Sequence, residues 1–442
     1  MCRVQDKVFT TLEHKLLKLD AEKHKRNLLT NNSHFTRTSR KLTFKDDMEI
    51  LIFSGASSLS KELYNYFNYD INTVSVPGFI KSRKKIKEEA FIELMKMVNK
   101  AYPCRKKYKG YRLLAVDGTN VSIASDENDI DNKNPCAPSS KGAWMFHTNA
   151  LYDLMNHRYI DNIIQSLKNM NEVKAMWTMV ERYEGDKAIF IADRNYATWN
   201  NMEHIIKSGH YFLIRSKDIH SGTSILKKFN LPDKEFDLDV ETILTKKSSK
   251  EIRNEPHKYR LLSNTSTFDY INSNNPFYHV KYRVVRVRLD TSDKYESIIT
   301  NLPRDSFPPN IIKELYKLRW DIEVSYKHLK YSVNLNALHS KKRAFIRQEI
   351  WAKLIMFNMS MIIIDELHKK KLSKRVRKWE YRINISMAVH LIKQYSLGIR
   401  KGGNPPNYED LILKQILPVR PNRNYPRNVR PQGYVAFGYR ST

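Results

Sequence analysis

The stretch 316-YKLRWDIEVSYKHLK-330 predicts a helix with a narrow polar stripe beside its buried face. At about 100° per residue, four side chains fall within about 60° of one another: those of Tyr316, Arg319, Glu323 and Lys330. An apolar stripe about 90° away predicts the buried face and consists of Leu315, Leu318, Ile322, Tyr326, Leu329 and Val333. Taken alone, the polar stripe favours a solvated flank in which Arg319 and Glu323 form a pair worth about 0.2–0.5 kcal/mol.

Two more carboxylates follow apolar stretches that predict strands of one sheet. The segment 111–123 is a predicted buried strand with Asp117 near its end, and 188–198 is another that ends on Asp193. Each aspartate alone is more often a turn residue, although ligands bind at such strand ends. The predicted fold class is α/β, with a mixed sheet flanked by helices, because further segments complete the pattern: strands at 144–155 and 157–167, a helix near 171–184, and a helix and strand over 199–218.

The rest of the chain divides into segments of different composition. Alternating polar and apolar residues predict an all-β insertion, with strands at 236–244, 257–264, 278–290 and 295–302. Long helices are expected near 345–370 and 382–399. The expected organisation has five parts: an N-terminal helical DNA-binding domain (1–105), the first part of a catalytic domain (106–218), the β-strand insertion (219–302), the second catalytic part with C-terminal helices (303–400) and a basic extended tail (401–442).

The N-terminal part has two interpretations. Helices are predicted over 1–30, 43–55, 57–68 and 77–102. Short helices of which the last is basic suit a helix-turn-helix-like module, and a plain helical bundle with a charged face fits equally well. In the first interpretation the helix around 79–90 contacts bases and the C-terminal region mainly contacts phosphates. The candidate DNA-binding residues are Lys81, Arg83, Lys84, Lys85 and Lys87.

The charge of the chain indicates a polyanionic partner. Its 442 residues include 77 Lys and Arg against 47 Asp and Glu, a formal net charge of +30. The ends are basic, with +11 in residues 1–110 and +16 in residues 331–442, which leaves +3 for 111–330. A Lys-rich genome can raise the lysine content but does not explain the shortage of acids. We therefore expect the two ends to bind DNA around a nearly neutral central domain.

The sequence favours a reduced cytoplasmic protein. Cys2, Cys104 and Cys136 have no paired or zinc-site spacing. The N-terminus has no apolar segment of the signal-peptide type. The apolar run 354–364 is too short to cross a bilayer and predicts a core helix. With DNA as the expected partner, we place the protein in the prokaryotic cytoplasm, associated with the nucleoid.

The three carboxylates suggest a metal site if the helix over 316–330 covers the sheet. Asp117, Asp193 and Glu323 brought together repel one another, which raises their pKa values. Divalent cations remove this cost, and Mg²⁺ favours a few carboxylates together with water and phosphate oxygens. Two ions about 3.5–4 Å apart activate a water and stabilise a leaving oxygen. The pattern therefore predicts metal-assisted phosphodiester chemistry.

These motifs together resemble a DDE transposase of the insertion-sequence-4-like family, whose catalytic core is ribonuclease-H-like. The family's Y-x₂-R-x₃-E-x₆-K signature is matched by Tyr316, Arg319, Glu323 and Lys330. Its D-G-T/S motif is matched by Asp117-Gly118-Thr119, and its D-R-G-aromatic motif by Asp193-Arg194-Asn195-Tyr196. Asn195 replaces a glycine, and asparagine tolerates the left-handed backbone that such a turn can require. The resemblance covers roughly residues 35–400 and includes a β-strand insertion.

The resemblance implies the reaction and the roles of the site residues. Asp117, Asp193 and Glu323 would hold two Mg²⁺ ions, for which Mn²⁺ substitutes, and no small-molecule cofactor is expected. Phosphates beside the cleaved bond would be contacted by Tyr316, Arg319 and Lys330, whose side chains suit this role. The resemblance also implies cut-and-paste transposition with a hairpin intermediate, by a homodimer assembled on the terminal inverted repeats and target DNA.

Three alternatives remain open. A ribonuclease-H-like endonuclease would cut DNA without transferring strands, although it needs neither the insertion nor the polar stripe. A DNA-binding relic of a transposase would lack catalysis, although all three carboxylates are present. A weaker hypothesis makes histidines metal ligands, but they lack the paired spacing of such sites: His147, His157, His328 and His339.

Overall fold

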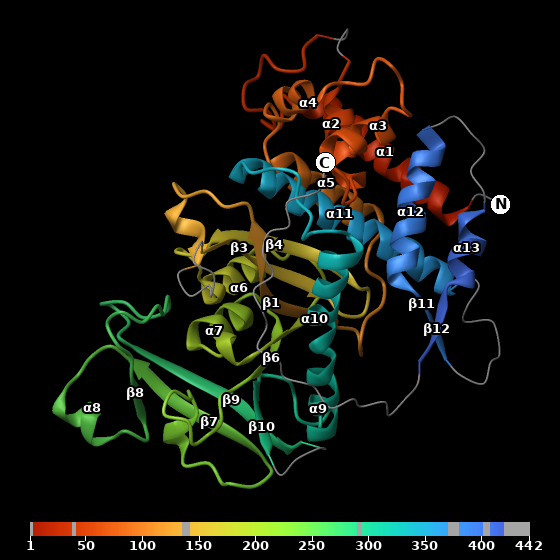
Figure 1. Ribbon diagram of the computed structural model, residues 1–442. Helices are drawn as coiled ribbons and strands as arrows, with labels where there is room; N and C mark the ends of the chain where they lie inside the picture. Colours follow the sequence, from red (N-terminus) through yellow and green to blue (C-terminus); the bar gives the residue numbers. More distant parts are fainter. Residues whose placement is uncertain are drawn as a thin grey trace.

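A mixed sheet lies at the centre of the computed structural model (Figure 1). In hydrogen-bonding order its described strands are β2, β3, β1, β5, β6, β10, β9, β7 and β8, and β4 also pairs with β3. Helices gather beyond one end of the sheet and the insertion strands lie at the other (Figure 1). The structure describes residues 3–37, 41–134, 142–289, 294–369, 380–400 and 407–419.

Five strands form the predicted ribonuclease-H-like core. The central strand β1 (Arg112–Ile123) pairs antiparallel with β3 (Ala143–Asp153), which pairs antiparallel with β4 (Arg158–Ser166). On its other side β1 pairs parallel with β5 (Ala188–Ala192), which pairs parallel with β6 (Tyr211–Arg215). The predicted fold class, a mixed sheet flanked by helices, is therefore confirmed.

Helices make the crossovers that parallel strands require. The first crossover contains α6 (Glu172–Glu181) and the second contains α7 (Trp199–Lys207). Both pack on one face of the sheet, in a core that includes Leu114, Phe190 and Phe212. The opposite face belongs to a separate, larger core shared with the helical region. Because the two cores lie on opposite faces, neighbouring residues of a strand alternate between them.

The insertion continues the central sheet. Its strands agree with the predicted runs: β7 (Phe236–Thr245), β8 (Tyr259–Leu261), β9 (Phe277–Arg288) and β10 (Tyr295–Thr300). The short helix α8 (Lys250–Asn254) lies between β7 and β8. Strand β10 pairs antiparallel with β6, with Ile299 opposite Ile214. The backbone hydrogen bonds of β6 thus join the insertion directly to the core.

Five helices make up the described N-terminal region, where the sequence predicts four, and their boundaries differ from the predicted ones. They are α1 (Val4–Glu22), α2 (Phe44–Phe53), α3 (Leu59–Tyr66), α4 (Val76–Arg83) and α5 (Glu89–Ala101). The predicted helix over 1–30 stops at Glu22, and a left-handed residue, Asn27, follows in a turn. The predicted helix over 77–102 is divided, because Ile86 leaves the helix to pair with Leu29.

The helix α11 (Arg343–Leu367) joins the N-terminal helices to the sheet. It is the expected core helix and is almost entirely buried. Arg83 at the end of α4 is 1% exposed and its Nη1 lies 3.0 Å from Oε1 of Glu349, which is 0% exposed. The backbone N–H of His339 donates to the other oxygen of Glu349 at 2.6 Å. The prediction that Arg83 contacts DNA is therefore wrong, since its guanidinium is used inside the protein.

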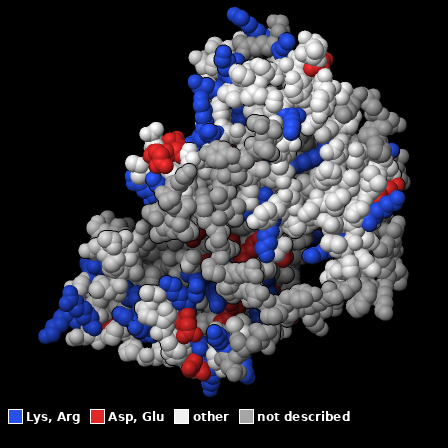
Figure 2. Space-filling model, in the orientation of Figure 1, with Lys and Arg blue, Asp and Glu red and all other residues white. Residues whose placement is uncertain are grey.

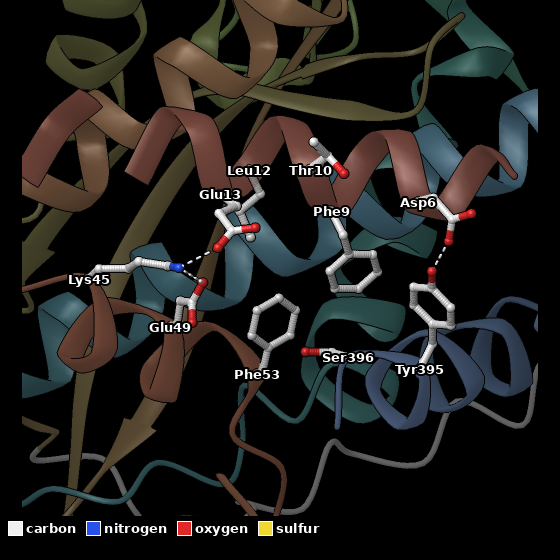
Figure 3. A pocket seen from close by; sticks show the side chains of 10 residues that line it. All are labelled: Asp6, Phe9, Thr10, Leu12, Glu13, Lys45, Glu49, Phe53, Tyr395 and Ser396. Carbon is white, nitrogen blue, oxygen red and sulfur yellow. Dashed lines mark hydrogen bonds and ion pairs between the residues drawn. The ribbon is translucent and has the colours of Figure 1, made fainter. Parts of the chain in front are cut away.

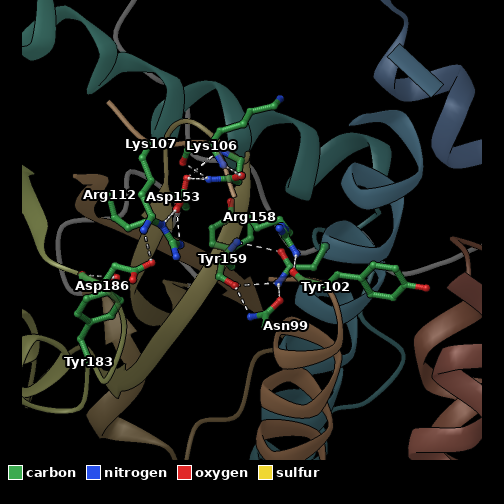
Figure 4. A network of polar contacts seen from close by, with 12 residues as sticks. Asn99, Tyr102, Lys106, Lys107, Arg112, Asp153, Arg158, Tyr159, Tyr183 and Asp186 are labelled. Atoms are coloured by element: carbon green, nitrogen blue, oxygen red, sulfur yellow. Dashed lines mark hydrogen bonds and ion pairs between the residues drawn. The ribbon is translucent and has the colours of Figure 1, made fainter. Parts of the chain in front are cut away.

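Polar contacts also tie α5 to the sheet (Figure 4). The side chain of Asn99 donates to the carbonyl of Tyr159 at 3.0 Å, and Arg158 donates to the carbonyl of Tyr102. In the same network Arg112 of β1 pairs with Asp153 of β3. The pair between Arg112 and Asp153 lies at the start of β1, before Asp117 is reached. These contacts therefore anchor the beginning of the strand.

The C-terminal part differs from the expected extended tail. After β11 (Tyr381–Ile383) and α12 (Ile385–Arg400), residues 408–418 form α13 (Tyr408–Lys414) and β12 (Ile416–Pro418). Strand β12 pairs with β11, which gives this segment a partner that the sequence did not indicate. The rest of the predicted tail, at 401–406 and 420–442, lies outside the described residues. The segment 370–379, before β11, also lies outside them. Within the described ranges no helix is both long and apolar enough to cross a membrane.

We predict that Glu349→Gln strongly destabilises the fold. Burial raises the pKa of Glu349, but the charge of Arg83 and the contacts from His339 outweigh it and lower the pKa to about 2. Losing one partner of a buried pair costs about 3–5 kcal/mol, measurable by urea unfolding at pH 7. Because the folded pKa is depressed, the difference should shrink as pH falls from about 4.5 towards 2.

Glu93→Gln, which breaks a partly exposed pair with Lys96, should cost less than about 1 kcal/mol. An equal effect of the two changes would contradict the assignment.

Candidate active site

The register between β1 and β5 brings the two predicted aspartates together. The last parallel pair joins Val116 to Ala192, so Asp117 and Asp193 are the next residues on neighbouring strands. Ala115 and Ile191, two residues earlier, face the larger core. Because side chains alternate along a strand, both aspartates face the same side of the sheet. Strand β1 itself continues to Ile123 beside β3, so Asp117 ends the parallel pairing and lies in the middle of its strand.

The predicted helix covers this side of the sheet (Figure 1). It consists of α9 (Pro309–Leu318), α10 (Trp320–Lys327) and a π turn, η4 (His328–Ser332). Arg319 separates α9 from α10 but keeps helical angles, φ −50° and ψ −32°. The prediction of one regular helix is therefore wrong at the π turn, which rotates Lys330 relative to Glu323. Single π turns of this kind occur frequently at functional sites.

Three side-chain contacts fix the helix against the strands. The hydroxyl of Tyr326 donates to the carbonyl of Asp117 at 2.6 Å. The hydroxyls of Ser325 and Tyr159 are 2.8 Å apart. Nζ of Lys330 donates to Oγ1 of Thr119 at 2.7 Å. The helix is thus anchored to the strands on the C-terminal side of Glu323, and this carboxylate lies near enough to Asp117 to raise its pKa.

The electrostatics of Asp117 reflect this convergence. Burial raises its pKa most; Arg319 lowers the pKa, whereas Asp193 and Glu323 raise it further, and the result is about 7. Charges act on a carboxyl group in this way only when they lie near it. The structure therefore brings together the three carboxylates that the sequence predicts, one from each of β1, the β5–α7 turn and α10.

The remaining residues of the polar stripe surround this group. Arg319 donates from Nη2 to Oε1 of Glu323 at 2.7 Å, so the i,i+4 pair expected from the sequence is present. Tyr316 is 6% exposed, burial raises its pKa to about 12, and its hydroxyl has no hydrogen-bond partner within the described residues. An unpaired buried donor costs about 1–3 kcal/mol. The Tyr316 hydroxyl therefore keeps an unused hydrogen-bonding capacity in the described structure.

The donor set suits a divalent cation. Carboxylate oxygens are the ligands that Mg²⁺ prefers. Burial is the main cause of the raised pKa of Asp117, and the charges of Asp193 and Glu323 raise it further. Within the described ranges, however, no group of three or more His, Cys, Asp or Glu side chains is arranged to hold a metal ion. Glu323 is turned to Arg319. Cation binding therefore requires the Glu323 carboxylate to turn from the guanidinium towards the aspartates.

The tripeptide Asp117-Gly118-Thr119 has a physical explanation for each residue. Asp117 contributes its carboxylate and Thr119, on the same face, accepts the hydrogen bond from Lys330. Gly118 faces the opposite side, where an added Cβ would lie 2.5 Å from Oε1 of Glu172 and 2.5 Å from Nε2 of His147. Glycine is required because no other residue leaves room for these two side chains.

The second aspartate begins a tight turn. Asp193 accepts a hydrogen bond at Oδ1 from the backbone N–H of Asn195 at 2.8 Å and starts the 3₁₀ turn η2 (Arg194–Tyr196). Asn195 is not among the residues with positive φ. The left-handed conformation considered for this position is therefore not used, and the asparagine fits without strain.

Sequence reasoning missed the roles of several residues beside the site, although it named Tyr196 in the second aspartate motif and His147 as a possible metal ligand. Tyr326 belongs to the predicted apolar stripe, and nothing in that pattern distinguishes its hydroxyl. Glu172 is the first residue of α6, and His147 and Tyr196 come from other elements. Alternation along β3 places His147 on the same face as Asn149, but only the packing of α6 brings Glu172 to it.

The candidate DNA-binding residues have different surroundings. Lys81 and Lys84 are exposed, Lys85 is half-buried with its Nζ 5.6 Å from the ring of Phe35, and Lys87 donates to the carbonyl of Asn27 at 3.1 Å. Lys84, Lys85 and Lys87 lie in the turn between α4 and α5, outside any helix. Basic side chains occur around this region and across the insertion, while acidic ones gather near the middle of the face (Figure 2).

Two cavities of the helical region differ in chemistry. One of about 520 Å³, between the α4–α5 turn and the start of α11, includes Lys84, Lys87, Lys342 and Arg347 in its lining. Another of about 370 Å³ lies between α1, α2 and α12 (Figure 3) and is lined by three acidic residues, one lysine and several aromatic rings. The first cavity is also lined by Glu88 and Glu89, and Glu88 is paired with Arg347, so its lining keeps only a small excess of positive charge. The second has an excess of negative charge, which does not suit a polyanion.

Residues 108–359 match the family model described as a transposase DDE domain. The putative transposase InsL of insertion sequence element IS186A from Escherichia coli (strain K12) is 30% identical over 87 residues, 20% of this chain and 22% of that protein. The transposase InsG of insertion sequence element IS4 from the same strain is 27% identical over 136 residues, 28% of this chain and 29% of that protein. The matches thus span less than a third of these relatives.

Among solved structures, the piggyBac transposase in a synaptic complex with hairpin DNA is similar, with a TM-score of 0.44 and 9% sequence identity. That alignment covers 92% of this chain and 83% of the other.

We predict that Asp117→Asn stabilises the metal-free protein at high pH. The folded state binds the Asp117 proton more tightly than the unfolded state, so wild-type stability declines as pH rises from about 4 to about 7. The amide carries no charge and avoids this loss, which is at most about 4 kcal/mol for a shift of this size. Urea unfolding in a chelator at pH 4 and pH 8 measures the difference.

Asp305→Asn, at an exposed residue, should show no such pH dependence. A similar pH dependence in both variants would refute the prediction.

Proposed function

The chain belongs to the transposase DDE domain family, and from this premise we propose that it is a DNA transposase that cuts the ends of its insertion sequence and joins them to target DNA. The observation that carries the proposal is the convergence of Asp117, Asp193 and Glu323 on one face of the sheet. Their approach is electrostatically unfavourable without cations. A cluster of this kind is expected where phosphodiester bonds are cleaved with divalent metals.

The proposed roles follow the contacts of each side chain. Asp117, Asp193 and Glu323 would hold two Mg²⁺ ions, which supply Lewis-acid activation of water and of the phosphate. Arg319 would exchange its bond to Glu323 for a phosphate, which a guanidinium binds bidentately. The buried Tyr316 hydroxyl would donate to a second phosphate oxygen, because it has no partner in the described protein. Lys330, now bonded to Thr119, would add a point charge beside Asp117.

The finer assignment rests on the sequence resemblance. The signature formed by Tyr316, Arg319, Glu323 and Lys330 is that of the insertion-sequence-4-like family, and we extend to this chain the cut-and-paste route and the hairpin intermediate that it implies. In this route water cuts one strand at the element end, and the freed 3′-OH attacks a phosphodiester. No covalent bond to the protein is required.

Basic residues outside the catalytic face support DNA as the substrate. Lys81 and Lys84 are exposed, and the adjoining cavity is lined by further basic side chains. We propose that the N-terminal helical domain reads the terminal repeat through the α4–α5 turn and that the active form is a homodimer on DNA. The base-reading surface is then a turn and its flanking helix, because Arg83 is buried in the contact with Glu349.

The proposed function predicts a specific effect of Glu323→Gln. With DNA carrying the ends of the element and Mg²⁺ or Mn²⁺, the wild type should give cleaved, hairpin and joined products, and the variant should bind but cut at least about 100-fold more slowly. Glu314→Gln is the matched control: Glu314 is exposed and lies nine residues earlier, on the opposite side of the helix. Gel analysis of labelled DNA separates the outcomes. Cleavage without joined products would support the nuclease alternative, and binding without cleavage by the wild type would support the DNA-binding relic.

The proposed DNA-binding surface predicts the effect of the double charge reversal Lys84→Glu/Lys85→Glu. It should weaken binding to the terminal repeat, and the slope of log affinity against log salt should fall by about 2, since each lysine that contacts a phosphate contributes about 0.9. Lys227→Glu/Lys228→Glu, an exposed lysine pair in the insertion, is the control. Fluorescence anisotropy from 50 to 200 mM salt measures both. Unchanged affinity and slope in the Lys84/Lys85 variant would remove the α4–α5 turn from the DNA-binding surface.

A further inference from the structure

A buried polar cluster lies under the Asp117–Gly118 peptide, on the face of the sheet opposite the three carboxylates. His147 of β3 is 5% exposed. Its Nδ1 is 2.8 Å from Oδ1 of Asn120, its neighbour in the β1–β3 register. Its Nε2 is 3.0 Å from Oε1 of Glu172, at an ion-pair distance but without hydrogen-bond alignment. The ring is therefore held between β1 and the first turn of α6.

This cluster contacts the backbone next to Asp117. The position that a Cβ on Gly118 would occupy is 2.5 Å from both His147 Nε2 and Glu172 Oε1. On the other face of the same peptide, the hydroxyl of Tyr326 donates to the carbonyl of Asp117 at 2.6 Å. The Asp117–Gly118 peptide is thus held from both sides of the sheet. A shift of the histidine ring or the carboxylate would let β1 move and would turn the Asp117 side chain.

A second contact on this face leads to the other aspartate. Asn149 lies opposite Gly118 in the β1–β3 register and is 0% exposed. Its Oδ1 is 3.4 Å from the hydroxyl of Tyr196, the last residue of the turn that Asp193 begins. The same layer of buried polar groups therefore reaches the supports of both aspartates.

From these contacts we infer that His147 and Glu172 are positioning residues that hold Asp117 in the orientation needed to bind a divalent cation. The inference rests on the proposed function, because it assigns the two residues to the metal site of that function. They lie on the far side of the strand from the carboxylates and touch neither the metal nor the substrate. Outer residues that orient metal ligands typically change metal affinity or activity by about 10–100-fold when they are replaced.

The chain contains a matched histidine remote from the site. His204 of α7 is 8% exposed and faces two carboxylates, Glu181 at 3.0 Å and Asp269 at 2.8 Å. Glu172 begins α6 and Glu181 ends it, so the two clusters lie at opposite ends of this helix, about 13 Å apart along its axis. Loss of either ring removes a buried imidazole between polar partners. Only the loss of His147 should affect Asp117.

The test compares Mn²⁺ binding by the full chain in complex with uncleaved DNA for the wild type, His147→Ala, His147→Gln, Glu172→Gln and His204→Ala. Titration followed by electron paramagnetic resonance gives the metal affinity without requiring turnover. We expect His147→Ala to weaken Mn²⁺ binding at least tenfold, His147→Gln and Glu172→Gln to weaken it less, and His204→Ala to leave it unchanged. Metal-free DNA affinity should be the same in all five proteins.

The outcomes separate this inference from the proposed function. Wild-type affinity in both His147→Ala and Glu172→Gln overturns the positioning role while leaving the metal site intact. An equal loss of affinity in His204→Ala also overturns it, since the effect would then follow general destabilisation. If His147→Ala does not fold, as judged by circular dichroism, the milder Glu172→Gln decides. If the wild type binds no Mn²⁺, the proposed metal chemistry itself fails, and the positioning role fails with it.

Discussion

The parallel register between β1 and β5 is the constraint on which the candidate site depends. Val116 lies opposite Ala192, and the residue that follows each of them is an aspartate. Alternate residues of both strands belong to different cores, one shared with α6 and α7 and the other with the helical region. A slip by one residue would turn an entire strand's apolar side chains to the wrong core. The packing that stabilises the sheet therefore also fixes the two carboxylates on one face.

The third carboxylate is positioned through helices. Tyr326 and Lys330 bind α10 and the following π turn to β1, and Ser325 meets Tyr159 of β4. The backbone of Tyr159 exchanges hydrogen bonds with the side chain of Asn358 in α11, and α11 carries Glu349, the partner of Arg83 in the N-terminal region. The helical region and the Glu323 helix thus share one buried support, the helix α11.

The site keeps unfavourable features that the rest of the fold must tolerate. Asp117 has a pKa of about 7 because it is buried near two other acids, and the Tyr316 hydroxyl is buried without a partner in the described structure. Strongly perturbed groups of this kind concentrate at functional sites. The glycine beside Asp117 belongs to the same arrangement, because it makes room for His147 and Glu172 beneath the strand.

Sequence patterns alone predicted the strongly periodic strands and helices and the candidate site residues: Asp117, Asp193 and Glu323, with Tyr316, Arg319 and Lys330 on one helix. These are local properties, set by hydrophobic patterning and motif spacing. Three features depend on the folded protein: the insertion extends the central sheet through β6 and β10, Arg83 is buried against Glu349, and the helix predicted over 77–102 breaks where Ile86 pairs with Leu29. Each of these depends on a partner far away in the chain, and local propensity carries no information about such partners. For the same reason the support beneath Asp117 could not be predicted, because α6 meets His147 only in the folded protein.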